Sequence, residues 1–122
     1  MTRKLAERRG RRGEGWAGWW LRLQGWRIVA RRVKTPRGEI DLIARRGDLV
    51  AFVEVKGRRG DRYGQPVEAV TSRKRQEIES VARWWIVRHA DPVVRYRFDV
   101  VTVSEDQRGV LALRHIEDAW RP

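Results

Sequence analysis

Apolar residues recur with a helical period in two segments of the chain. Over residues 2–24, large apolar side chains return at helical spacing, which predicts a helix that Gly25 is placed to terminate. Thr71 or Ser72 can cap a second helix that extends to about Arg88. The apolar stripe of this second helix consists of Ile78, Val81, Ala82, Trp85 and Ile86.

Shorter runs with alternating or β-branched apolar residues predict five strands. They cover residues 26–34, 38–46, 49–58, 95–104 and 109–116. A loop rich in glycine and arginine is expected over residues 57–70. The order α-β-β-β-α-β-β predicts an α/β fold in which two helices flank a mixed β-sheet. We expect one domain over residues 1–122, in which 1–12 is a candidate flexible basic tail.

The second and third strands are expected to form a hairpin around Gly47–Asp48. A two-residue loop places Asp41 opposite Glu54 and Glu39 opposite Lys56, and a symmetric four-residue loop keeps this register. A three-residue loop would send Asp41 and Glu54 to opposite faces. With the two-residue loop, one face of the hairpin is wholly apolar and carries Ile40, Leu42, Ala44, Ala51, Val53 and Val55. The charged residues then gather on the other face, at the end far from the turn.

Two carboxylates that face each other on a half-buried sheet repel each other, and a bound cation reverses this effect. Carboxylate oxygens suit Mg²⁺ or Mn²⁺, and Lys56 is placed to orient or activate an attacking water or to stabilise charge on a phosphate. The structural alternative is an ion pair between Glu39 and Lys56, with Asp41 paired to an arginine. Glu14, on the first helix, either faces the sheet or is an ordinary acid of an early helical turn.

The charge of the chain points to a polyanionic partner. Its 28 Lys and Arg residues against 16 Asp and Glu residues give a net charge of +12. Nucleic acid is favoured, because attraction to an anionic membrane is usually carried by one amphipathic basic helix, whereas arginines occur here along the whole chain. An arginine-rich proteome would explain the preference for Arg over Lys, but it leaves the excess over carboxylates unexplained.

Several classes of protein are excluded by what the sequence lacks. There is no cysteine, so disulfides and thiolate metal sites are absent. No apolar run is long enough to span a bilayer, and no apolar stretch follows the basic N-terminus as in a signal peptide. We therefore expect a cytoplasmic protein without a membrane partner. The candidate nucleic-acid-binding residues are Arg11, Arg12, Arg58, Arg59, Tyr63, Arg73, Lys74 and Arg75.

The hairpin resembles the core of PD-(D/E)xK nucleases, in which an acidic residue on one strand precedes a (D/E)xK motif on the next. The ordered motifs GEGWAGWWL, GEIDLIA, FVEVKGR, YGQPVEAVTSRK and RFDVV resemble the YraN-like family of small uncharacterised bacterial proteins. This resemblance covers about residues 13 to 103 and implies a restriction-endonuclease-like fold, similar to archaeal Holliday-junction resolvases. It also implies that Glu14, Asp41 and Glu54 face the metal, that Lys56 is catalytic and that Glu39 supports or replaces Asp41. The proline of the superfamily motif is absent, because Ile40 precedes Asp41.

These observations together predict a metal-dependent endonuclease that hydrolyses phosphodiester bonds in DNA, with branched or structured DNA as the candidate substrate. A homodimer is the candidate assembly, because a symmetric junction offers two equivalent sites. The competing hypotheses are a non-catalytic nucleic-acid-binding module with a nuclease-like fold, and an interaction subunit of a DNA-processing complex. The sequence contains no recognisable element that reads bases, so the choice between DNA and RNA stays open.

Overall fold

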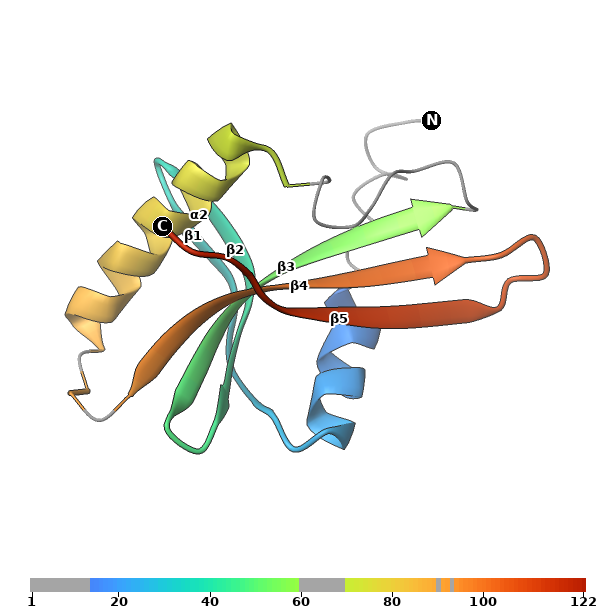
Figure 1. Ribbon diagram of the computed structural model, residues 1–122, viewed down its shortest axis with the longest axis horizontal. Helices are drawn as coiled ribbons and strands as arrows, with labels where there is room; N and C mark the ends of the chain where they lie inside the picture. Colours follow the sequence, from blue (N-terminus) through green and yellow to red (C-terminus); the bar gives the residue numbers. More distant parts are fainter. Residues whose placement is uncertain (1–13, 60–69, 90, 93) are drawn as a thin grey trace.

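A five-stranded sheet with the order β1-β2-β3-β4-β5 organises the chain (Figure 1). The computed structural model describes residues 14–59, 70–89, 91–92 and 94–122, and residues 14–23 of this part form an N-terminal helix. The other elements are β1 (Arg27–Thr35), β2 (Gly38–Arg46), β3 (Leu49–Arg59), α2 (Ser72–Arg88), β4 (Arg95–Glu105) and β5 (Leu111–Trp120). This element order is the predicted one.

The sheet is mixed, as predicted. Neighbouring strands are antiparallel except for β3 and β4, which run parallel from the pair Leu49–Arg95 to the pair Arg59–Glu105. A parallel pair needs a crossover connection, and α2 lies in the crossover between these two strands.

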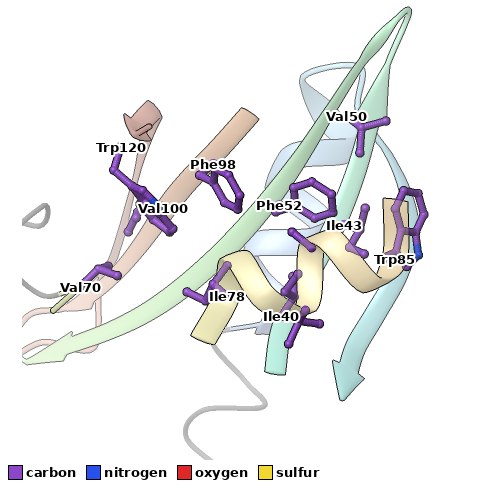
Figure 2. Packing of buried hydrophobic residues seen from close by; sticks show 12 residues of the cluster. Ile40, Ile43, Val50, Phe52, Val70, Ile78, Trp85, Phe98, Val100 and Trp120 are labelled. Atoms are coloured by element: carbon purple, nitrogen blue, oxygen red, sulfur yellow. The ribbon is translucent and has the colours of Figure 1, made fainter. Parts of the chain in front are cut away.

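Each face of the sheet carries its own hydrophobic core, so the fold has three layers. On one face, the predicted stripe of α2 packs on the sheet around the fully buried Phe52 (Figure 2). On the other face, Ala17 and Leu21 of the N-terminal helix pack on the alternate residues of the same strands. No helix within the described ranges is long and apolar enough to cross a membrane.

The predicted helix ends are confirmed. Thr71 is the N-cap of α2, and its hydroxyl oxygen accepts a hydrogen bond of 3.2 Å from the backbone N–H of Lys74. Gly25 follows the N-terminal helix with a φ of +91°, a left-handed conformation that glycine adopts without steric cost.

The hairpin of β2 and β3 has the predicted two-residue loop, because Arg46 pairs with Leu49. Gly47 has a φ of +61°, as the first residue of a tight hairpin turn requires. The ladder ends at the pair Leu42–Val53, beyond which the two strands diverge (Figure 1). The expectation that Ile40 lies on the face of Leu42 is therefore wrong. Where β2 leaves β3, Ile40 turns toward α2 and packs in the core on that side.

Candidate active site

The two strands diverge where the predicted acidic residues lie. Asp41 is the first residue of β2 beyond the last ladder pair, and its Oδ2 accepts a hydrogen bond of 2.7 Å from the backbone N–H of Val55. A side-chain carboxylate on β2 thus takes the place of a backbone carbonyl as the acceptor for this N–H of β3. This bond places Asp41 beside Glu54, the pair that the hairpin register predicted.

Asp41 and Glu54 interact electrostatically. Burial raises the pKa of Asp41 to about 8, the charge of Glu54 and a hydrogen bond with its carboxyl add to the rise, and the bond from Val55 opposes it. Glu54 is buried, and its Oε2 has no hydrogen-bond donor among the described residues. Two carboxyl groups can share a hydrogen bond only if a proton lies between them, so the pair is suited to hold either a proton or a cation.

Lys56 lies beside the same pair of carboxylates. Its Nζ is 3.4 Å from Oε1 of Glu54, while Oε2 is the atom for which no described residue supplies a donor. The lysine side chain is about one-third exposed, whereas the Glu54 side chain is almost fully buried. Lys56 therefore reaches from solvent into the carboxylate site. The structural alternative of a Glu39–Lys56 ion pair is not formed, because the β2–β3 ladder ends before these residues and Glu39 pairs in register with Lys34 on β1.

Glu14 projects from the N-terminal helix toward the sheet. Its Oε2 accepts a hydrogen bond of 2.7 Å from Nε of Arg32. Its negative charge also contributes to the raised pKa of Asp41, which places it in the electrostatic surroundings of the site. Glu14 is thus one of the carboxylates at this site, but its carboxylate is already hydrogen-bonded to Arg32.

Arg32 is a residue of this site that the sequence did not reveal. It lies between Arg31 and Val33, which pair with Leu42 and Ile40, so its place on β1 is across from Asp41. Its φ is +49°, a left-handed conformation that a residue with a long side chain rarely adopts. Backbone strain of this kind persists where the surrounding structure enforces it, often at functional sites. Because arginine favours other conformations, no sequence signal could have identified it.

The residues of the site fit a divalent metal only in part. Within the described ranges, no group of three or more His, Cys, Asp or Glu side chains is arranged to hold a metal ion. Two features nevertheless suit a hard cation: the metal-ligating atoms would be carboxylate oxygens, and one buried oxygen of Glu54 has no partner in the described part of the chain. Asp41 and Glu54 could therefore hold Mg²⁺ or Mn²⁺ together with water or substrate oxygens. Glu14 would join them only after leaving Arg32.

Most of the predicted nucleic-acid-binding residues lie at the start of α2 or outside the described part of the chain. Arg73 pairs with Glu77 at 3.6 Å, and Nε of Arg75 donates to the carbonyl oxygen of Val70 at 3.0 Å. Lys74 lies in the same first turn, which holds no acidic residue. Arg58 and Arg59 are the last residues of β3. Arg11, Arg12 and Tyr63 lie outside the described residues.

A second charged cluster lies on β4 and β5. Asp99 is fully buried and accepts two hydrogen bonds of 2.8 Å from Arg97, one of 2.9 Å from the backbone N–H of Asp118, and a contact of 2.6 Å with Nε2 of His115. Burial alone would raise the pKa of Asp99, but the bonds from His115 and Arg97 outweigh it and lower that pKa. Arg97 and Asp99 thus form a structural ion pair within this cluster.

Comparison with known proteins supports the resemblance of the motifs. The model of a family described as uncharacterised protein family UPF0102 matches residues 13–103. A UPF0102 protein of Sphingopyxis alaskensis is 43% identical over 122 residues, which is 100% of both chains. One of Mesorhizobium japonicum is 50% identical over 120 residues, 98% of this chain and 91% of its own. One of Chelativorans sp. is 49% identical over 121 residues, 98% and 93% of the two chains. The chain therefore belongs to the uncharacterised bacterial protein family UPF0102, the YraN-like family that its motifs indicate.

Proposed function

We propose that this protein is a metal-dependent endonuclease that hydrolyses phosphodiester bonds in DNA, on a restriction-endonuclease-like fold. The observation that carries the proposal is the buried oxygen of Glu54 that has no donor among the residues the structure describes, beside an Asp41 whose pKa is raised to about 8. A carboxyl group whose pKa is strongly raised by burial and by a neighbouring charge is typical of catalytic sites. The net charge of +12 supports a polyanionic substrate.

Each residue of the site has a distinct role in this proposal. Asp41 and Glu54 supply the carboxylate oxygens that hold Mg²⁺ or Mn²⁺, and Asp41 gives up its proton to do so. Bound there, the ion would polarise a phosphoryl oxygen and lower the pKa of a water molecule. Lys56, held at Glu54, orients the attacking water or stabilises negative charge on the phosphate. Glu14 assists through a water or directly, and Arg32 determines when it is free to do so.

Cleavage of labelled DNA tests the proposal directly. Single-stranded, duplex and four-way-junction DNA are incubated with Mg²⁺, Mn²⁺ or EDTA, using the wild type and Lys56→Ala. We expect metal-dependent cutting that falls about 100-fold or more in Lys56→Ala, because the variant loses a charge at the reacting phosphate. Lys34→Ala is the matched control, since Lys34 is an exposed lysine on β1.

Two results would overturn the proposal. Equal cutting by the wild type and Lys56→Ala would identify a contaminating nuclease. Binding of all three DNA forms without cutting, in either metal, would favour the non-catalytic nucleic-acid-binding module instead. Asp41→Asn separates these cases further, because the enzyme predicts that it loses cleavage while its DNA affinity stays close to that of the wild type.

A further inference from the structure

A surface pocket of about 250 Å³ lies between the β1–β2 turn and the solvent-facing side of α2. It is separate from the carboxylate site, and none of its residues was predicted to bind nucleic acid. Its lining combines an indole ring, two guanidinium groups, two hydroxyl groups and a proline. The lining residues are Thr35, Pro36, Arg37, Ser80, Arg83 and Trp84.

A close approach of two backbones holds the walls of this pocket together. A Cβ atom on Gly38 would lie 3.0 Å from Cβ of Glu77 and 3.4 Å from its carbonyl oxygen, so the start of β2 can touch α2 only because residue 38 is glycine. The turn itself is ordered by a hydrogen bond of 3.1 Å from the backbone N–H of Arg37 to Oγ1 of Thr35. The pocket is therefore built by the fold rather than by flexible side chains alone.

Trp84 lies outside the hydrophobic core that α2 forms with the sheet. Its neighbour Trp85 is buried and packs edge-on against Phe52 in the core, whereas Trp84 is 40% exposed. The guanidinium of Arg88 lies 4.4 Å from the centre of the Trp84 ring. An exposed indole beside cationic groups is suited to stack on the base of a nucleotide.

The charges around the pocket favour an anionic ligand. Among the described residues, no acidic side chain lines it. Within the described part of the chain, neither Arg37 nor Arg83 forms a salt bridge, and Arg83 donates only to the hydroxyl of Ser80 at 3.2 Å. A guanidinium that is not neutralised by a carboxylate is a good partner for a phosphate.

We propose that this pocket binds one unpaired nucleotide of the nucleic-acid substrate, with its base stacked on Trp84 and its phosphate between Arg37 and Arg83. An acidic peptide would satisfy the guanidinium groups but would leave the indole ring without a stacking partner, whereas a nucleotide uses both. The link of this pocket to cleavage rests on the proposed nuclease function, but its binding of a nucleotide does not.

The position of the pocket relates it to the carboxylate site. Gly38 at the pocket and Asp41 at the site are three residues apart on β2, which at about 3.3 Å per residue is about 10 Å. Stacked nucleotides advance about 3.4 Å along a strand, so this separation corresponds to about three nucleotides. A substrate strand whose phosphate is held at Arg37, next to Gly38, would thus need only a short unpaired segment to approach Asp41.

Binding measured without cleavage tests the proposal. The affinities of a single-stranded oligodeoxythymidylate of about 10 nucleotides and of a duplex of equal length are measured by fluorescence anisotropy in EDTA at constant salt. We expect Trp84→Ala to weaken single-strand binding by about 5-fold to 100-fold and to leave duplex binding unchanged, because one base loses its stacking partner. Trp84→Phe should restore most of the affinity. Trp16→Ala, on the N-terminal helix, is the matched control, because Trp16 is 51% exposed.

The arginines give a second, independent measurement. Arg37→Gln should weaken single-strand binding and reduce the slope of log affinity against log salt by about one phosphate contact. The proposal is overturned if Trp84→Ala has no effect, if it weakens single-strand and duplex binding equally, or if an oligoglutamate competes as well as the oligonucleotide does.

The proposal for the pocket and the proposal for the nuclease function are disproved by different results. If the wild type cuts DNA but Trp84→Ala binds single strands normally, the pocket proposal is wrong and the nuclease proposal stands. If the wild type does not cut but Trp84→Ala loses single-strand binding, the pocket stands and the protein is a binding module.

Discussion

The Asp41 carboxylate accepts a hydrogen bond of 2.7 Å from the backbone N–H of Val55, directly beyond the last pair of the β2–β3 ladder. This bond satisfies a donor that the diverging strand would leave unpaired. It also holds Asp41 beside Glu54, where burial and negative charge raise its pKa to about 8. The acidic site thus lies where β2 and β3 separate, and the protonation state of Asp41 affects the free energy of unfolding.

Asp41→Asn should stabilise the metal-free protein at alkaline pH. Because the folded-state pKa of Asp41 lies above its usual value of 3.8, its protonated form stabilises the fold, and this contribution is lost progressively as the pH rises from about 3.8 to about 8. The asparagine can still accept the bond from Val55 without repelling Glu54. We expect the variant to exceed the wild type by about 1–3 kcal/mol above pH 8. Urea unfolding from pH 5 to pH 9 in EDTA measures this, with Asp48→Asn, an exposed aspartate, as the control. If the difference in unfolding free energy between Asp41→Asn and the wild type is the same at every pH in this range, the raised pKa of Asp41 is contradicted.

A divalent cation should stabilise the wild type but not variants of the carboxylate pair. Mn²⁺ or Mg²⁺ is expected to raise the unfolding midpoint by several degrees in the wild type, because the ion binds the folded state only. Asp41→Asn and Glu54→Gln should lose this rise, and Glu77→Gln should keep it, since Glu77 lies on α2 and pairs with Arg73. Calorimetry near pH 7 should also detect the release of about one proton on binding, from Asp41. A midpoint that rises equally in all four proteins would indicate that the ion binds elsewhere.

Two glycine substitutions should have opposite effects. Gly38→Ala brings a Cβ within 3.0 Å of Glu77 and is expected to destabilise the fold by about 1–3 kcal/mol through overpacking. Gly15→Ala, in the N-terminal helix with no atom within 4 Å of the added Cβ, should stabilise it by about 0.5–1 kcal/mol. Thermal unfolding of both variants checks the pair. If Gly38→Ala were neutral, α2 would not approach the β1–β2 turn as closely as described.

Asp99→Asn should be strongly destabilising at neutral pH. The substitution removes the buried charge that holds Arg97 and His115, and we expect a loss of about 3 kcal/mol. Because the pKa of Asp99 is lowered, its contribution is present at neutral pH and is lost only as the pH falls below the usual value of 3.8. Denaturant unfolding between pH 3 and pH 8 measures the difference. Asp118→Asn, whose carboxylate pairs with the exposed Arg121, should cost less than about 1 kcal/mol. Similar losses in the two variants would argue against a special role for the buried charge.

The sequence predicted the elements and the hairpin register because both depend on local patterns. The alternation of Ile43, Phe52 and their neighbours, with the turn at Gly47–Asp48, was sufficient to bring Asp41 next to Glu54. It did not predict that the ladder stops at Leu42–Val53, because the alternation of apolar residues continues past this pair, although Ile40 packs in the core with α2.

The hydrogen bond between Glu14 and Arg32 could not be predicted from the sequence either. The contact with Arg32 joins a helix to a strand and requires a left-handed arginine, neither of which has a local signal. In contrast, the pairing of Arg97 with Asp99 could be predicted, because residues two apart on a strand share a face. The third contact of that aspartate, with His115, depends on the register of β5 and became visible only in the folded chain.

The crossover between β3 and β4 has a consequence for the kinetics of folding. β1, β2 and β3 are joined by short turns, so they can form a meander early, whereas β4 joins β3 only after the longer connection through α2 has closed. Asp41 and Glu54 both belong to the meander, so they meet while water still screens their charges. Their charges lose this screening when α2 packs on the sheet and β4 pairs with β3. A rise in pH is therefore expected to slow the late closing step and to leave the formation of the hairpins at its original rate.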